Sequence, residues 1–126
     1  GIHVHGFPNM LMVAGPQSVS GSTNFPRAIE TGVDWLTDLL VHARDEGATR
    51  VDARPEAEEH WVKEVVRAHE KLLFRRSKGW FTGYNSNVAG HQEGQIRYQA
   101  YFGGAPKYIK VINQEAADGY PGIEIV

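Results

Sequence analysis

The residues with the best-defined potential for ligand binding form the loop of residues 15–24, between a short apolar segment and a long amphipathic pattern. Small side chains dominate this loop (Gly-Pro-Gln-Ser-Val-Ser-Gly-Ser-Thr-Asn), so a flat ligand can approach its backbone. A helix that begins after Asn24 presents unpaired N–H groups and a partial positive charge to the same place. Such a site, at the carboxyl end of a strand, suits a carbonyl group or an anionic ring edge. An ordinary strand-to-helix connection accounts for the same local features, and both interpretations stay open.

The same loop invites comparison with the nucleophile elbow of hydrolases, because Ser20 lies between a predicted strand and a predicted helix. The elbow motif Gly-x-Ser-x-Gly needs glycines two residues before and after the nucleophile, since they permit a sharp turn. Ser18 and Ser22 occupy these positions here. We therefore reject the elbow, and a small hydrolase that uses Ser20 is the weakest of our hypotheses.

A second candidate for ligand binding begins at Trp80, in a stretch from Gly79 to Gly94 that is rich in Gly, Asn and Ser. A stretch of this length without helical periodicity is a functional loop or a disordered one. Glycines beside large aromatic side chains permit a lid whose rings stack on a ligand. The alternative is that Trp80 and Phe81 pack into the core.

Several kinds of chemistry are excluded by the absence of their motifs. The chain has no cysteine, which excludes disulfides, thiolate metal sites and cysteine nucleophiles. Its 6 histidines show no metal-ligand spacing, and we predict no metal site. Neither Gly-x-Gly-x-x-Gly nor a phosphate-binding loop occurs. Any nucleotide cofactor must therefore be held mainly by residues outside this chain.

Length and charge suit one ordinary globular domain or a piece of a larger one. The chain has 126 residues, a net charge of −2 and 22% charged residues, with no basic stripe for nucleic acid. No apolar run approaches the ~20 residues of a membrane helix, and no signal peptide is visible. We expect a cytoplasmic location. The chain begins at Gly1 and contains 14 glycines, from which we expect a fragment.

Three helices and several short strands are predicted to position these residues, which makes the fold class α/β. The first helix begins near Asn24 to Pro26 and stops at Gly47. One buried face is expected at Ile29, Val33, Leu36 and Leu40. The second helix begins at Pro55, ends around Phe74 to Lys78, and is expected to bury Trp61, Val65, Ala68 and Leu72. The third covers Pro106 to Asp118, with Tyr108, Ile112 and Ala116 on one side.

The expected strands are short. Met10 to Ala14 is apolar and bounded by turn residues, which predicts a buried strand. Gln95 to Phe102 alternates and is rich in β-prone residues, which predicts another. Thr49 to Ala53 suits a short strand or an extended linker, and Ile123 to Val126 a last strand.

Taken in order, the landmarks of the chain resemble the C-terminal part of the Baeyer–Villiger monooxygenases. The resemblance extends from about residue 6 to residue 122. Each landmark is weak alone, and their shared order and spacing carry the match. They are Gly6-Phe7-Pro8-Asn9-Met10, Gly15-Pro16-Gln17-Ser18, Ser22-Thr23-Asn24-Phe25-Pro26, Ile29-Glu30, Val33-Asp34-Trp35, Glu56-Ala57-Glu58 with Trp61, Trp80 with Gly83 and Asn85, Tyr101-Phe102-Gly103-Gly104, and Asp118-Gly119-Tyr120 with Gly122.

The resemblance implies a flavoprotein with two dinucleotide-binding domains that binds FAD and NADPH. In that family NADPH reduces the flavin, and O2 adds to give a C4a-peroxyflavin. This species inserts one oxygen atom next to a ketone carbonyl, which gives an ester or a lactone. The family's glycine fingerprints, signature motif and active-site arginine lie upstream of the matched segment. No catalytic residue is therefore assigned to this chain, and we expect it to be inactive without the N-terminal portion.

Residue roles carry over by position in the motifs. The resemblance implies that the cofactor is contacted by Gly15, Pro16, Asn24, Phe25 and Trp80. It implies a ketone pocket lined by Ser20, Gly21, Ser22, Thr23 and Phe25. Trp80 would sit in a mobile loop that closes over NADP and substrate.

The resemblance also implies a division of the chain into three parts. Residues 1–78 would complete an FAD-binding domain with a strand, the flavin-facing loop and two helices. Residues 79–94 would form the mobile loop, and residues 95–126 a strand-helix-strand segment. After Asn85 the chain reads Ser-Asn-Val-Ala-Gly-His, where enzymes for small-ring ketones have a shorter loop with Pro-Gly-Lys. This departure points to the branch that acts on large-ring, polycyclic or steroid ketones.

One alternative comes from a different class of protein. A non-catalytic domain or fragment could fold by itself, or self-associate through bare sheet edges and apolar faces. Flavin titration and size-exclusion chromatography distinguish this alternative from the flavoenzyme.

Overall fold

The computed structural model describes residues 1–92 and 96–126, without the side chains of Ser20, Ser22 and Phe74. Its helices are α1 (Phe25–Asp45), α2 (Pro55–His69) and α3 (Ala105–Ala117), and its strands are β1 (Val51–Ala53) and β2 (Ile123–Ile125). Short 3-10 helices cover Val19–Ser22, Leu73–Arg76 and Trp80–Thr82. Within the described ranges, no helix combines the length and the apolar character that crossing a bilayer requires.

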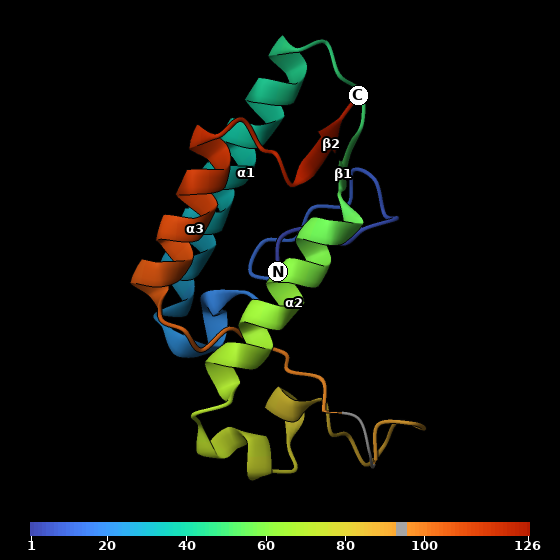
Figure 1. The fold of residues 1–126 in the computed structure, drawn as a ribbon, viewed down its shortest axis with the longest axis vertical. Helices are drawn as coiled ribbons and strands as arrows, with labels where there is room; N and C mark the ends of the chain where they lie inside the picture. The colour runs from blue at the N-terminus through green and yellow to red at the C-terminus, as the bar shows by residue number, and fades with distance from the viewer. Residues whose placement is uncertain (93–95) are drawn as a thin grey trace.

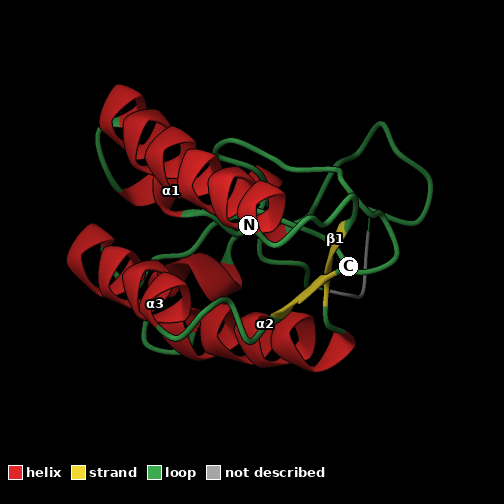
Figure 2. Ribbon diagram, turned by 90° about the horizontal axis from the view of Figure 1, so that it is seen from above, coloured by secondary structure: helices red, strands yellow, loops and turns green. Residues whose placement is uncertain are grey.

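The helices α1 and α3 lie side by side (Figures 1 and 2), and α2 follows directly on β1 (Figure 1). The indole of Trp35 on α1 donates a buried hydrogen bond to the Ile112 carbonyl of α3 (2.6 Å). The ring of Trp61 on α2 meets that of Tyr108 on α3, with centroids 5.8 Å apart. The core therefore forms where aromatic side chains of three helices converge.

The helix α1 begins as predicted. The Asn24 side chain accepts a hydrogen bond from the Arg27 N–H (3.2 Å), and Pro26 occupies the first turn. At the other end, Gly47 has φ +71°, and the Ala48 N–H donates to the Ala43 carbonyl (2.9 Å). A glycine is needed there because other residues rarely adopt positive φ.

The predicted buried face of α1 was partly wrong. Leu36 is buried, but the side chains of Val33 and Leu40 are 44% and 52% exposed. The buried face instead contains Ala28, Gly32, Trp35, Leu36, Leu39 and Ala43. Because Trp35 must reach α3 to donate its hydrogen bond, the helix is rotated relative to the stripe of large aliphatic residues.

The helix α2 starts at Pro55 as predicted and ends at His69, earlier than predicted. Val65 and His69 are fully buried, and Trp61 and Ala68 are partly buried. The segment expected to continue the helix turns into the 3-10 helix Leu73–Arg76. Leu73 is 83% exposed, and the basic residues Arg75, Arg76 and Lys78 follow it, so this segment offers little apolar surface that would extend α2.

The third helix and the last strand are confirmed. The helix α3 buries Tyr108 and Ile112, with Ala116 partly buried on the same side. The strand β2 pairs antiparallel with β1, with Val51 opposite Ile125 and Ala53 opposite Ile123. The terminal segment is thereby joined to the middle of the chain.

Two predicted strands are not formed. In the segment Met10–Ala14, a single bridge joins Leu11 to His3. Asn9 and Ala14 have φ of 62° and 54°, so left-handed residues at both ends leave no room for a ladder. Residues 96–102 are extended but irregular, because their partners are loops and not strands. Gln95, the first residue of this predicted strand, lies outside the described residues.

The packing around Gly103 makes a testable prediction. A Cβ atom at Gly103 would lie 2.0 Å from Tyr101 Oη, and the Tyr101 side chain is 1% exposed. Because the buried ring has little room to move, we expect Gly103→Ala to lower the free energy of unfolding by about 1–3 kcal/mol. Urea denaturation measures the change. Gly79→Ala is the matched control, since nothing lies within 4 Å of a Cβ there. Equal loss in both variants would contradict the packing.

The cap of α1 makes a second prediction. Replacing Asn24 by Ala removes the acceptor for the Arg27 N–H, so the free energy of unfolding should fall by about 1 kcal/mol. Asn24→Ser keeps an acceptor and should retain most of the stability. The urea midpoint should shift without a change in the slope of the transition. If Ser costs as much as Ala, the capping bond is not what stabilises this end of α1.

Candidate functional site

The backbone of loop 15–18 (residues 15–18) is held by other parts of the chain. Gln17 has φ 64°, and its N–H donates to the Gln99 carbonyl (2.7 Å). The Ser18 N–H donates to the Gly15 carbonyl (3.1 Å). A Cβ on Gly15 would lie 2.8 Å from the Met12 Cβ, so a glycine is needed there for close packing. These amides are satisfied within the chain.

The start of α1 retains donors for a ligand. The Arg27 N–H is occupied by the Asn24 side chain, and Pro26 has no N–H. In the described part of the chain, the N–H groups of Thr23, Asn24 and Phe25 have no acceptor. Together with the helix dipole, these three donors can bind a carbonyl or an anionic ring edge. The Phe25 side chain beside them is 52% exposed and can contact an apolar ring.

The predicted ketone-pocket residues differ in their surroundings. A Cβ on Gly21 would lie 3.0 Å from the Ala100 Cβ and 3.2 Å from a ring carbon of Phe81, so Gly21 permits a close contact between segments. Thr23 is half-buried. The side chains of Ser20 and Ser22 lie outside the described part of the structure. Thr23 and Phe25 thus lie together at the start of α1.

Trp80 lies in a closed turn of residues 79–84, here the Trp80 turn. The Gly83 N–H donates to the Trp80 carbonyl (2.9 Å), and the Thr82 hydroxyl lies within hydrogen-bond distance of the Ser77 and Gly79 carbonyls (3.0 and 2.9 Å). Phe81 packs edge-on against Phe102, with centroids 5.5 Å apart. The Trp80 side chain is 64% exposed, so of the two aromatic residues only Phe81 joins the packed interior.

Residues 97–101, here the strap, connect the two predicted regions. On one side the N–H groups of Arg97 and Gln99 donate to the Thr82 and Phe81 carbonyls (2.9 and 3.0 Å). On the other side the Gln99 carbonyl accepts from Gln17, and the Tyr101 N–H donates to the Ser18 carbonyl (2.8 Å). Loop 15–18 and the Trp80 turn, about 65 residues apart in the sequence, therefore flank one extended segment.

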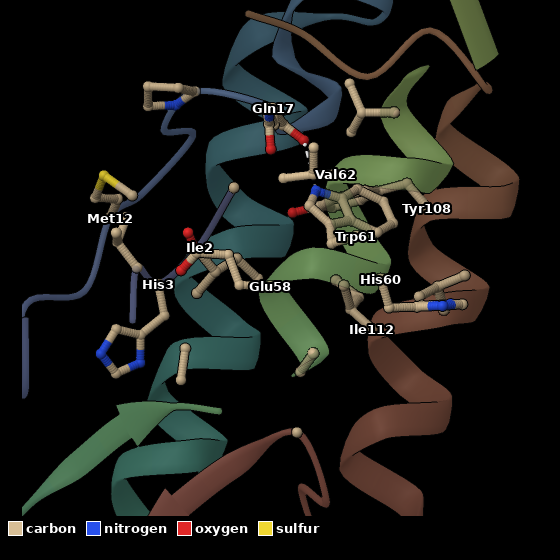
Figure 3. Close-up of a pocket in the computed structure, with 18 of the residues that line it drawn as sticks. Ile2, His3, Met12, Gln17, Glu58, His60, Trp61, Val62, Tyr108 and Ile112 are labelled. Atoms are coloured by element: carbon tan, nitrogen blue, oxygen red, sulfur yellow. Dashed lines mark hydrogen bonds between the residues drawn. The ribbon is translucent and has the colours of Figure 1, made fainter. Parts of the chain in front are cut away.

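A cavity of about 620 Å³ lies between the N-terminal residues, α2 and α3 (Figure 3). Of the five predicted cofactor residues, Pro16 alone lines it, so the cavity and the predicted site largely differ. The Trp61 indole crosses it and donates to the Gln17 carbonyl (3.2 Å). Burial raises the pKa of the Tyr108 phenol to about 12, so this ring stays neutral and acts as an apolar wall. Other lining residues are Ile2, Met12, Val65 and Ile112.

The histidines do not gather at one place. His3 lies 3.9 Å from Asp52, whereas His69 is buried beside Tyr98. Among residues 1–92 and 96–126, no three histidine or acidic side chains are grouped so that they could hold a metal ion.

Sequence reasoning missed the strap and the support beneath it. His69 stacks on Tyr98, with ring centroids 3.8 Å apart and an angle of 14° between the planes. Its position four residues after Val65, on the buried side of α2, was the available signal for burial. No local pattern indicated that residues 97–101 would bind two loops, because both partners are distant in the sequence.

No family model matches the chain. Among curated proteins, it is 35% identical over 125 residues to cyclopentanone 1,2-monooxygenase of Comamonas sp. (strain NCIMB 9872), covering 99% of this chain and 22% of that protein. Among solved structures, it matches cyclohexanone monooxygenase from Rhodococcus sp. Phi1 bound to NADP+, with a TM-score of 0.85 and 34% identity over 99% of this chain and 22% of that one. An oxidized steroid monooxygenase bound to NADP matches with a TM-score of 0.84 and 28% identity, over 100% of this chain and 22% of that one.

The chain spans about a fifth of the length of these relatives, and the match extends over its whole length. The arrangement of three helices and two short strands agrees with the solved structures over the same range. The relatives include enzymes named for small-ring and for steroid substrates, so they do not separate the branches of the family. The chain belongs to the Baeyer–Villiger monooxygenase family and corresponds to the C-terminal part of its fold, which has two dinucleotide-binding domains.

Proposed function

We propose that this chain is part of a flavin-dependent monooxygenase that inserts one oxygen atom of O2 next to a ketone carbonyl, giving an ester or a lactone. The observation that carries the proposal is the whole-chain match to enzymes named as ketone monooxygenases. The proposed cofactors are FAD and NADPH, both bound mainly by residues outside this chain. FAD supplies the redox chemistry that activates O2, and NADPH supplies the hydride.

The residues of this chain fit one edge of a flavin. We assign the open N–H groups of Thr23, Asn24 and Phe25 to a carbonyl edge of the ring, because α1 directs its partial positive charge there. Gly15 and Pro16 hold the preceding turn in place, since the adjoining amides are already satisfied. These groups bind and orient, and none of them has a side chain that transfers a proton.

The ketone is proposed to lie beside the same helix start. Thr23 and Phe25 offer a hydroxyl and an exposed ring there, and Ser20, Gly21 and Ser22 belong to the same short segment. The Trp80 turn is proposed to close over NADP and substrate, because its exposed indole offers a surface on which a ligand can stack. A closed turn excludes water from the reacting groups.

The chain alone is proposed to be inactive, because both dinucleotide fingerprints are absent from it. Its proposed partner is the N-terminal portion of the enzyme. Mixing the purified chain with FAD, NADPH and a cyclic ketone should give no lactone, and turnover would overturn the proposed dependence. Flavin titration and size-exclusion chromatography test the alternative of a non-catalytic, self-associating domain, which predicts an oligomer without flavin affinity.

Three further assignments stay proposals. They are the division at residues 78 and 94, the large-ring, polycyclic or steroid branch, and the cytoplasmic location. The longer loop after Asn85 supports the branch. Comparing initial rates on a cyclopentanone and on a steroid ketone, in the enzyme that contains this chain, decides the branch.

The Trp80 assignment makes a third prediction. In the full enzyme, Trp80→Ala should lower kcat/KM for the ketone at least about 10-fold, because the closed turn loses its stacking surface, whereas Trp80→Phe should retain most of it. Leu73→Ala is the matched control, since Leu73 is 83% exposed on the neighbouring 3-10 helix. Steady-state NADPH oxidation with product analysis measures the effect. A loss of equal size in Leu73→Ala would refute a specific role of Trp80.

A further inference from the structure

The strap is hydrogen-bonded to the Trp80 turn along one edge and to loop 15–18 along the other. Gln99 uses its N–H for Phe81 and its carbonyl for Gln17, so one residue carries a bond in each direction. Arg97 adds a bond to the Trp80 turn, and Tyr101 adds one to loop 15–18. If either loop 15–18 or the Trp80 turn moves, it pulls on the strap through these hydrogen bonds. The strap in turn pulls on the segment along its other edge.

The strap and the Trp80 turn pack closely at Gly83. Gly83 has φ +77°, and a Cβ there would lie 2.8 Å from the Arg97 Cβ and 2.9 Å from the Arg97 carbonyl oxygen. On the other side, Gly21 permits the close approach of Ala100, at 3.0 Å from a Cβ built on the glycine. The strap thus makes close contacts at two glycines, Gly83 in the Trp80 turn and Gly21 in the segment that follows loop 15–18.

His69 of α2 packs against the strap at Tyr98. The imidazole is fully buried and stacks on Tyr98, and its edge meets Phe102 at 5.1 Å between centroids. Its Nδ1 donates to the Val65 carbonyl (2.9 Å), which fixes the tautomer and turns the ring toward the strap. In the described part of the chain, its buried Nε2 has no hydrogen-bond partner. The ring therefore contacts the strap through its flat face, at Tyr98.

We propose that the strap couples the flavin-facing loop 15–18 to the Trp80 turn, and that His69 is the positioning residue that holds the strap by stacking on Tyr98. The coupling itself is inferred from the hydrogen bonds alone. Its effect on catalysis also rests on the proposed function. The two loops then respond together when a ligand moves either one. Because His69 holds the strap through the stacking of its flat ring, a phenylalanine at this position should hold the strap equally well.

The coupling is tested by amide hydrogen exchange in the protein and in two variants. In His69→Ala, exchange at Gln17, Arg97, Gln99 and Tyr101 should rise together by at least about 10-fold, while amides in α1 and α3 change little. In His69→Phe, all four should stay within about 3-fold of the original rates. Lys63→Ala, on the exposed face of α2, is the matched control and should change none of them.

Each outcome of the exchange experiment decides the proposal. If the strap amides Arg97 and Gln99 lose protection while Gln17 and Tyr101 keep it, the two loops are not coupled. If His69→Phe behaves like His69→Ala, the imidazole acts through its nitrogen atoms, and positioning by shape is overturned. If α1 and α3 also lose protection in His69→Ala, its role is that of an ordinary core residue.

The catalytic consequence is tested in the flavoenzyme that contains this chain. Uncoupled turnover converts NADPH, H+ and O2 into NADP+ and H2O2 without oxidising the ketone. The fraction of NADPH consumed in this way should rise several-fold in His69→Ala and stay near the original value in His69→Phe and Lys63→Ala. An unchanged fraction in His69→Ala overturns the catalytic part of the inference. Absence of ketone oxidation in the unmodified enzyme overturns the proposed function, and the exchange results still stand.

Discussion

Burial of the Tyr101 ring between α2 and α3 is the contact on which the arrangement of the site depends. The ring lies 4.9 Å from Trp61 and 6.1 Å from Tyr108, measured between centroids. Its own N–H binds the Ser18 carbonyl, and Gly103 leaves the space that the phenol occupies. One residue thus connects the helical core, loop 15–18 and the strap. Burial of so large an aromatic side chain is among the stronger stabilising terms available to a small core.

The geometry is compatible with the proposal that a segment without a dinucleotide fingerprint contributes to a cofactor site. The proposed contribution comes from backbone N–H groups at the start of α1 and from an exposed indole, and neither requires a sequence motif of its own. Asn24 caps one donor and leaves three others open, which gives the helix end a preference for a carbonyl or an anion. The proposed flavin site therefore depends on the rest of the enzyme for affinity and on this chain for orientation.

The helices were predictable because their signals are local. Asn24, Pro26 and Gly47 define α1 by capping and by positive φ, and Pro55 defines the start of α2. The strands were less predictable, because a strand requires a partner. Ile123–Ile125 found one in Val51–Ala53, whereas Met10–Ala14 and residues 96–102 had only loops beside them. The sequence also did not predict that the Trp35 side of α1 is buried, since this orientation follows from one hydrogen bond between Trp35 and α3.

The sequence by itself determined the helices, their caps, the absence of thiol chemistry, and the two segments that were predicted to meet a ligand. It also carried the family resemblance, because ordered landmarks survive in the chain without any knowledge of packing. Only the tertiary structure decided that loop 15–18 and the Trp80 turn lie on opposite sides of one strap, and that His69 supports it. The physical reason is that these contacts join residues dozens of positions apart. Propensity and periodicity describe neighbours along the chain, whereas packing selects neighbours in space.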